Sequence, residues 1–158
     1  MKIGLFPMVA DLLHAGHLHA IEYAKQHCDY LIVAMNVDPA SDNSMKHKPV
    51  ETVYQRFKRL DCCRFVDKIM VYSGEEDLLR LLTTTLYDVR FVGEDHISSW
   101  TGKDYEQGMG IQHCIIPRRH NESTSNLRKR IAEQESKETS TGTIPGLKSK
   151  EEFRNEQK

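Results

Sequence analysis

The sequence lacks the features that mark most secreted, zinc-binding and disulfide-rich chains. Only four of its 158 residues are cysteine, and only one is tryptophan. The four cysteines show neither CxxC spacing nor a histidine at zinc-finger distance, so neither a disulfide framework nor a zinc finger is expected. We therefore expect reduced thiols in a cytoplasmic protein.

Long apolar segments and an excess of charge of one sign are also missing. Apolar runs are about four to six residues long, whereas a membrane span needs roughly 20. The first residues are too few for the apolar core of a signal peptide, so neither membrane insertion nor export is expected. Lysine and arginine number 22 against 23 aspartates and glutamates, which leaves no basic excess for binding a nucleic-acid backbone.

The sequence does contain an alternation of short apolar runs with helical patterns. The apolar runs predict five strands, at residues 3–9, 30–36, 68–72, 89–92 and 112–116. Helices are predicted at residues 17–26, 51–65 and 75–86, and from about 123 to 133. Apolar strands separated by helices indicate a parallel sheet covered on both faces. We predict a single Rossmann-like, doubly wound α/β domain with five parallel strands over residues 1–133.

Residues 134–158 differ in composition from the rest of the chain. They are mostly Glu, Lys, Ser, Thr, Gly and Gln, and their large apolar side chains are Ile144, Leu147 and Phe153. Such a segment buries too little apolar surface to offset the entropy lost on ordering. Either it is a disordered tail, or it docks on a partner through those three side chains.

The first predicted strand is followed by DLLHAGH, from Asp11 to His17. In a doubly wound sheet, ligands bind at the carboxyl ends of strands near the switch point. Gly16 permits close approach of backbone to ligand, and His17 opens a helix whose free N–H groups favour an anion. His14 and His17 therefore suit a polyphosphate. Because His17 and His19 face different ways on a helix, no protein-held metal is expected.

His-Ala-Gly-His at positions 14–17, between a strand and a helix, resembles the HxGH signature of the cytidylyltransferase-like nucleotidyltransferases. The resemblance covers about residues 1–132 and is nearest to bacterial glycerol-3-phosphate cytidylyltransferases. Further similar segments are residues 29–34, 54–57, 65–68, 93–95 and 117–125. Some segments are also similar to heptose-phosphate adenylyltransferases, and archaeal-type FAD synthetases share the same signatures.

The resemblance implies an enzyme that joins a nucleoside triphosphate to a small phosphorylated alcohol. The acceptor attacks the α-phosphate in line and pyrophosphate leaves, so positioning and charge stabilisation dominate. CTP is favoured as the nucleotide and glycerol 3-phosphate as the acceptor, which gives transfer of CMP. The alternatives are adenylyl transfer to a sugar phosphate or FMN-like acceptor, and a non-catalytic nucleotide-binding sensor or assembly subunit. Mg²⁺ would arrive with the triphosphate, and a homodimer is implied.

The resemblance also assigns roles to residues around the expected pocket. Those implied in catalysis are His14, His17, Lys46 and Arg118. Those implied in nucleotide binding are Val9, Ala10, Gly16, Gly93, Glu94, Arg118, Ser123 and Thr124. Those implied in acceptor binding are Asp11, Asp38, Lys48, Arg56 and Asp95.

Several of these residues have a plainer alternative. Lys46 and Lys48 can equally belong to a solvated loop, and Arg56 can pair with an acidic neighbour on its own helix. Glu94 can serve a turn, and Trp100 either closes over the acceptor or anchors its loop. The family usually has Gly-Thr/Ser-Phe where this chain has Met-Val-Ala at 8–10, which removes a glycine and a hydroxyl from the phosphate-facing turn.

Overall fold

The computed structural model of the chain describes residues 1–43, 45–118 and 122–141, with side chains described as far as residue 137. It divides into two compact units, Met1–Thr124 and Ser125–Lys158. Among the described residues, no helix is both long enough and apolar enough to cross a membrane.

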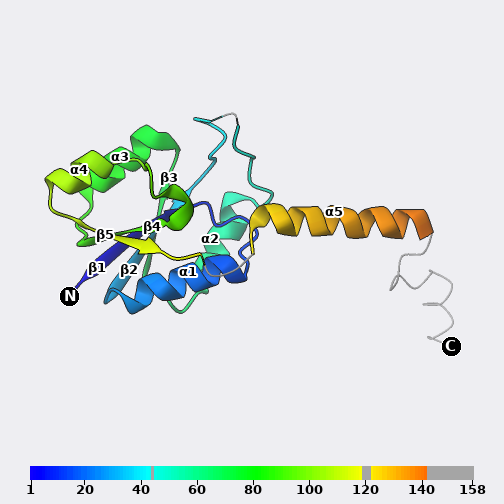
Figure 1. Cartoon of the computed structure of the whole chain (residues 1–158), viewed down its shortest axis with the longest axis horizontal. Coiled ribbons are helices and arrows are strands. Elements are labelled where there is room, and N and C mark those ends of the chain that lie inside the picture. The colour runs from blue at the N-terminus through cyan, green and yellow to red at the C-terminus, as the bar shows by residue number, and fades with distance from the viewer. Residues whose placement is uncertain (44, 119–121, 142–158) are drawn as a thin grey trace. The chain divides into compact units, whose positions relative to one another are not determined.

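The first unit is built on a parallel sheet of five strands in the order β3-β2-β1-β4-β5 (Figure 1). The strands are β1 (Ile3–Met8), β2 (Tyr30–Asn36), β3 (Lys68–Tyr72), β4 (Val89–Gly93) and β5 (Gln112–Ile116). The chain moves outward from β1 to β3 on one side and from β4 to β5 on the other. The switch point of this doubly wound sheet therefore lies between β1 and β4, as the predicted fold class requires.

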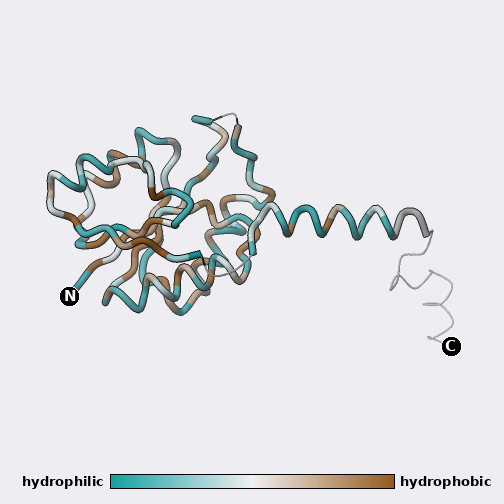
Figure 2. The backbone as a smooth tube through the Cα atoms, viewed as in Figure 1, coloured by the Kyte–Doolittle hydropathy of each residue, from teal (hydrophilic) through white to brown (hydrophobic). Residues whose placement is uncertain are grey.

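Helices cover both faces of the sheet. The helices among the described residues are α1 (Ala15–Gln26), α2 (Val53–Asp61), α3 (Gly74–Thr84), the 3-10 turn η1 (Glu94–His96), α4 (Lys103–Gly108) and α5 (Thr124–Thr141). α1 and α2 pack on one face, and α3 and α4 pack on the other (Figure 1). Figure 2 shows the apolar residues concentrated along the strands that these helices cover.

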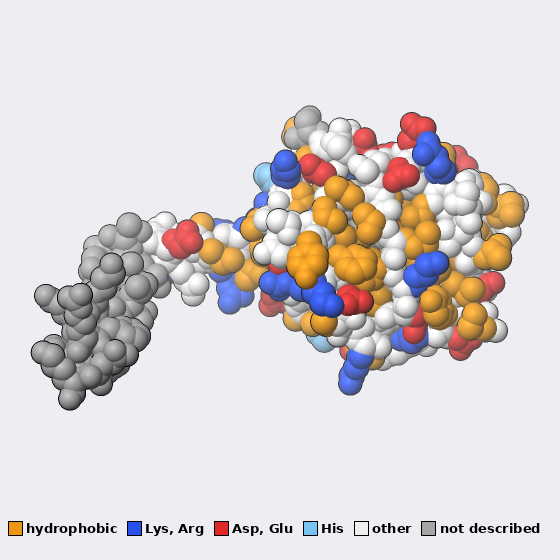
Figure 3. Space-filling view, turned by 180° about the vertical axis from the view of Figure 1, so that it is seen from behind, with side chains coloured by type: hydrophobic (Ala, Val, Ile, Leu, Met, Phe, Trp, Pro, Cys, Tyr) orange, Lys and Arg blue, Asp and Glu red, His pale blue; other side chains and the backbone are white. Residues whose placement is uncertain are grey.

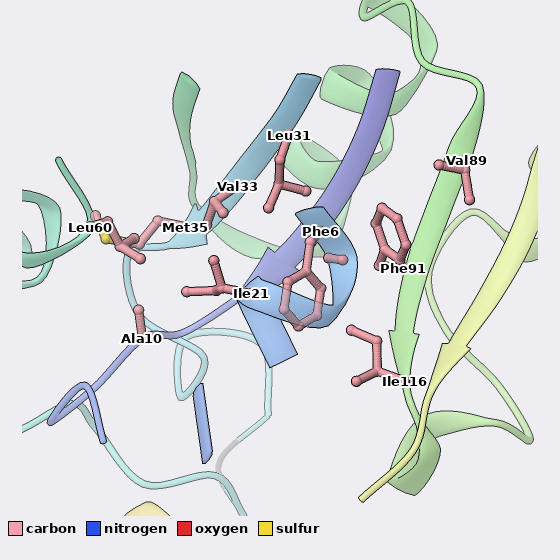
Figure 4. Close-up of a cluster of buried hydrophobic side chains, with 11 residues drawn as sticks. Phe6, Ala10, Ile21, Leu31, Val33, Met35, Leu60, Val89, Phe91 and Ile116 are labelled. Carbon is pink, nitrogen blue, oxygen red and sulfur yellow. The ribbon is translucent and has the colours of Figure 1, made fainter. Parts of the chain in front are cut away.

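The alternation of side chains along β2 divides the core into two layers. Leu31, Val33 and Met35 project toward Ile21 of α1 and Leu60 of α2 (Figure 4). The intervening residues of β2, Ile32 and Ala34, instead join the layer beneath α3 and α4. Since each fully buried aliphatic side chain contributes about 2 kcal/mol, a one-residue slip of this strand would disrupt both layers.

Most predicted elements are confirmed, with differences at their ends. α2 is shorter than the predicted 51–65, because Thr52 caps its N-terminus by accepting from Gln55 N and Cys62 ends it. The predicted loop at 96–110 contains α4, a helix too short for its periodicity to be recognised in the sequence.

The last helix continues to Thr141, past the predicted end near residue 133. Its residues are mainly good helix formers, and Lys129 and Glu133 form an i,i+4 ion pair at 3.9 Å. Figure 2 shows α5 as hydrophilic over most of its turns. The expected tail contacts at Ile144, Leu147 and Phe153 lie outside the described residues.

All four cysteines are free; Cys62 is exposed and the other three are half-buried. Burial raises the pKa of the Cys28 and Cys114 thiols, so these two are poor nucleophiles. Acidic and basic side chains are interspersed on the face of the first unit seen in Figure 3, with apolar side chains between them.

Candidate active site

A cleft of about 460 Å³ opens at the carboxyl ends of β1, β2 and β4, at the switch point of the sheet. Its walls come from the turn after β1, the start of α1, η1, the end of β5 and the residues that lead into α5. Every lining residue belongs to the first unit. Its volume is in the range of small-molecule sites.

The turn between β1 and α1 has an unusual backbone. Ala10 and Leu12 adopt positive φ values of 57° and 47°, a conformation that costs non-glycine residues about 1 kcal/mol each. Contacts with the segment before α2 hold it in place. Leu12 N donates to Glu51 Oε2 at 2.7 Å, and Glu51 N donates to Asp11 Oδ1 at 3.0 Å.

Arg56 of α2 fixes the same turn from beneath. Its side chain is 1% exposed, and it donates hydrogen bonds to three backbone carbonyl oxygens. Nη1 reaches Val9 O at 2.8 Å and Asn36 O at 2.6 Å, and Nη2 reaches Val37 O at 2.6 Å. Burial lowers the pKa of Arg56, and Asp11 and Glu51 raise it in opposition. The arginine remains charged and ties the loops after β1 and β2 together.

Two stacked histidines stand at the N-terminus of α1. The ring centroids of His14 and His17 are 4.0 Å apart, and both side chains line the cleft. His14 is the N-cap of α1, and the first turn of the helix contains no acidic residue. The positive end of the helix is therefore not neutralised from within the helix.

The hydrogen bonds of the two rings define their tautomers. His14 Nδ1 accepts from Gly16 N at 3.1 Å, and His17 Nδ1 accepts from His14 N at 3.5 Å. A backbone N–H can only donate, so each neutral ring carries its proton on Nε2. His14 Nε2 lies 3.4 Å from Thr124 Oγ1, which in turn donates to Asp11 O at 3.2 Å. Both rings thus present an Nε2–H donor.

The cleft brings together most of the residues singled out in the sequence. Those that line it are Val9, His14, Gly16, His17, Lys46, Gly93, Glu94, Asp95, Arg118, Ser123 and Thr124. A Cβ at Gly93 would lie 2.6 Å from Asp95 Oδ1, so the glycine leaves room for that carboxylate. Lys46 and Arg118 are exposed cations on different walls.

Five of the singled-out residues do not line the cleft. Ala10, Asp11 and Arg56 are buried in or under the turn after β1, where the contacts above give them a positioning role. Asp38 Oδ1 accepts from Ala40 N at 2.9 Å within its own turn, and Lys48 is exposed. The sequence could not separate residues that touch the cleft from those that support it, because both sets are neighbours along the chain.

Two further contacts concern the roles of Glu94 and Trp100. Glu94 Oε2 accepts from Arg118 N at 2.8 Å, so this carboxylate joins the ends of β4 and β5 while lining the cleft. Trp100 Nε1 donates to Glu106 Oε2 at 2.9 Å, which anchors its loop, and the same side chain lines the cleft.

The structure adds residues that were not singled out. Asn36, Tyr72, Glu75 and Arg90 line the side of the cleft nearest α3 and α4. Arg90 had a signal in the sequence, since it is a charged residue inside the apolar run 89–92. Within the described residues, no group of three or more His, Cys, Asp or Glu side chains is placed to hold a metal ion.

A parallel five-stranded α/β sheet with paired histidines at a helix N-terminus, beside its switch point, is typical of nucleotide-binding enzymes. The model of the cytidylyltransferase-like family matches residues 5–145. The chain therefore belongs to the cytidylyltransferase-like family of nucleotidyltransferases.

Curated relatives agree with this family. The chain is 32% identical over 124 residues to glycerol-3-phosphate cytidylyltransferase of Bacillus subtilis. The matched region covers 77% of this chain and 91% of the relative. It is 31% identical over 134 residues to bifunctional protein HldE of Caulobacter vibrioides, which covers 83% of this chain. The chain spans only about a quarter of the length of the HldE relatives, 27% in this case.

Solved structures with the same fold are more distant in sequence. The lipopolysaccharide core biosynthesis protein from Thermoplasma volcanium has a TM-score of 0.61 at 22% identity, covering 77% of this chain and 99% of that one. Pantoate-beta-alanine ligase from Francisella tularensis has a TM-score of 0.60 at 21% identity, covering 84% and 69%. At these identities the likeness supports the fold alone.

Proposed function

We propose that the chain transfers a nucleoside monophosphate, CMP in preference, from a nucleoside triphosphate to a small phosphorylated alcohol such as glycerol 3-phosphate. The observation that carries this proposal is the stacked pair His14 and His17, whose Nε2–H donors sit at the unneutralised N-terminus of α1 in the cleft. The similarity to glycerol-3-phosphate cytidylyltransferase of Bacillus subtilis supports the choice of nucleotide and acceptor.

In the proposed reaction, a phosphate oxygen of the acceptor attacks the α-phosphorus of the triphosphate. The bond from this phosphorus to the bridging oxygen breaks, and the electron pair leaves with pyrophosphate. The Nε2–H groups of His14 and His17 donate to the phosphate oxygens on which negative charge grows. Lys46 neutralises the acceptor phosphate, and Arg118 holds the β- and γ-phosphates from the opposite wall.

Ser123 and Thr124 complete the phosphate site by supplying hydroxyl groups at the start of α5. Gly16 keeps the backbone of α1 open to the triphosphate. Mg²⁺ would enter bound to the triphosphate and balance its charge there, since the described residues offer no cage of their own. We also propose a homodimer in the cytoplasm, for which the molar mass from light scattering is the direct test.

Pyrophosphate release tests the proposal. The purified chain is incubated with Mg²⁺ and each of CTP, ATP, GTP and UTP, against a panel of glycerol 3-phosphate, phosphoethanolamine, phosphocholine, sugar phosphates and FMN. Release with CTP and a phosphorylated alcohol is expected. Release with ATP and a sugar phosphate or FMN would correct the substrates. No release with any pair, while a nucleotide raises the melting temperature, would refute the enzyme and indicate a nucleotide-binding protein without catalysis.

A further inference from the structure

Arg90 is a buried charge in the middle of a sheet. It is 4% exposed and lies on β4 between Val89 and Phe91, which both point into the core beneath α1. Because side chains alternate along a strand, Arg90 projects to the opposite face, toward α3 and α4. Burying a guanidinium there is costly unless its donors are used.

The nearest anion does not use all these donors. Glu106 of α4 is fully buried, and its Oε1 is 3.4 Å from Arg90 Nη1, an ion pair without a hydrogen bond. Tyr87 Oη and Trp100 Nε1 each donate to the Glu106 carboxylate at 2.9 Å, and His113 Nε2 lies 3.3 Å away. The carboxylate is therefore largely occupied by groups other than Arg90.

Two buried side chains are left with unpaired atoms that belong to the same cleft. Arg90 Nε and Nη1 have no hydrogen-bond partner, and neither has Asn36 Oδ1, while the Asn36 side chain also makes a hydrogen bond with Tyr72. Arg90 and Asn36 both line the cleft. They lie on its α3 and α4 side, whereas the histidine pair belongs to α1 on the other face of the sheet. Buried polar atoms without a partner, on side chains that line a cleft, are typical of a site that binds a hydrogen-bonding ligand.

The charges nearby favour a neutral ligand. Glu106 balances Arg90, and the carboxylate of Glu75 also lines this side of the cleft, so a second anionic group would gain nothing. Burial raises the pKa of Tyr72 to about 12, which keeps its hydroxyl protonated at the same wall. A mixture of donors and acceptors without net positive charge matches hydroxyl groups, because each hydroxyl both donates and accepts.

We propose that Arg90 and Asn36 form a specificity subsite for a neutral, polyhydroxylated part of the acceptor. Arg90 donates to hydroxyl oxygens, and Asn36 Oδ1 accepts from a hydroxyl group. The subsite selects alcohols that carry free hydroxyls beyond the reacting phosphate and rejects those with alkyl or methylated ammonium groups there. This inference rests on the proposed function, because it names the chemistry of the acceptor for the same cleft.

A pair of small phosphates tests the subsite directly. Glycerol 3-phosphate and n-propyl phosphate have the same carbon chain and differ in two hydroxyl groups. Isothermal titration in the absence of CTP, so that no turnover occurs, gives the Kd of each for the wild-type chain. We expect glycerol 3-phosphate to bind at least about tenfold more tightly, the size expected when a site built for hydroxyls meets an analogue without them.

Two variants remove the subsite by different routes. Arg90→Met combined with Glu106→Gln removes the guanidinium without leaving a buried carboxylate unbalanced, and Asn36→Leu removes the acceptor alone. The ratio of the two Kd values should fall to within about twofold in the double variant and by about threefold in Asn36→Leu. The Kd of n-propyl phosphate should not change. Glu106→Gln alone is the matched control and should keep the full ratio, since the Arg90 donors remain.

The outcomes separate this inference from the proposed function. No preference in the wild-type chain, or a full preference in the double variant, would overturn the subsite. A preference that depends on Arg90 without pyrophosphate release from any pair would leave the subsite standing and refute the transferase. Equal pyrophosphate release with glycerol 3-phosphate and n-propyl phosphate would support the transferase and refute the subsite.

Discussion

Arg56→Met should be among the most destabilising single substitutions outside the apolar core. The side chain donates three hydrogen bonds to backbone carbonyls and is 1% exposed. Losing bonds from a charged donor, and leaving the carbonyls unpaired, costs about 1 to 2 kcal/mol each, or about 4 kcal/mol together. The buried Asp11 also loses the favourable charge of Arg56. Against a typical domain stability of about 5 to 15 kcal/mol, this is a large fraction.

Urea unfolding followed by circular dichroism measures this loss. With a slope of about 2 kcal/mol per molar urea, the midpoint should fall by about 2 M. The urea midpoint of Arg56→Lys should lie between those of wild type and Arg56→Met, because an ammonium cannot reach three carbonyls as the guanidinium fork does. Lys58→Met, on the exposed side of the same helix, is the matched control and should leave the midpoint unchanged. A midpoint for Arg56→Met equal to that of Lys58→Met would refute the assignment of Arg56 as the tie between the two loops.

Three further predictions follow from particular contacts. His17→Ala should lower kcat at least about a hundredfold, as measured by steady-state pyrophosphate release. His17→Gln should retain more activity than His17→Asn, because the glutamine amide nitrogen can replace Nε2 whereas the asparagine amide nitrogen replaces Nδ1. Higher activity in His17→Asn than in His17→Gln would contradict the assigned tautomer. Thr124→Val, which removes the hydroxyl between His14 Nε2 and Asp11 O, should lower kcat about tenfold, whereas Thr124→Ser should keep the wild-type kcat. Equal rates in the two variants would refute a role for the Thr124 hydroxyl in the site. For Asp67, burial raises the pKa, but hydrogen bonds from Leu31 N and Lys25 outweigh burial and leave this pKa lowered. The contribution of Asp67 to stability is therefore present above the unfolded value near 3.9 and is lost as pH falls through the folded pKa. The difference in Tm between wild type and Asp67→Asn should be constant from about pH 6 to 8 and shrink below about pH 4.

The strands were readable from the sequence because buried parallel strands need no alternation of polar residues. Residues 30–35 are apolar without interruption, and the structure packs them on both faces of the sheet. Arg90 is visible as a charge inside an apolar run, but the run does not reveal its role, because a single charged residue does not change the pattern of a buried strand. Whether such a residue points to solvent, to a partner or to a cleft depends on helices far away in the sequence. α4 supplies that answer here, and its short pattern was not recognisable.

The candidate site was predictable where chemistry depends on neighbours in the sequence. His14, Gly16 and His17 lie within one turn of helix, so their spacing alone indicates that they share a site. Asp11 and Arg56 illustrate the limit of the resemblance. A motif places them near the cleft, but only the three-dimensional contacts reveal that they bond to backbone and lie beneath it.

The Met-Val-Ala segment at residues 8–10 can be understood in the same physical terms. The family glycine corresponds to residue 8, which in this chain is Met8, the last residue of β1, whereas the two positive φ values fall further on, at Ala10 and Leu12. The strain of about 2 kcal/mol is smaller than what the hydrogen bonds with Arg56, Glu51 and Thr124 supply to the same turn. The turn is thus held in shape by its contacts with Arg56, Glu51 and Thr124. Substituting glycine at residue 10 should therefore leave the positions of His14 and His17 unchanged, whereas removing Arg56 should disturb them.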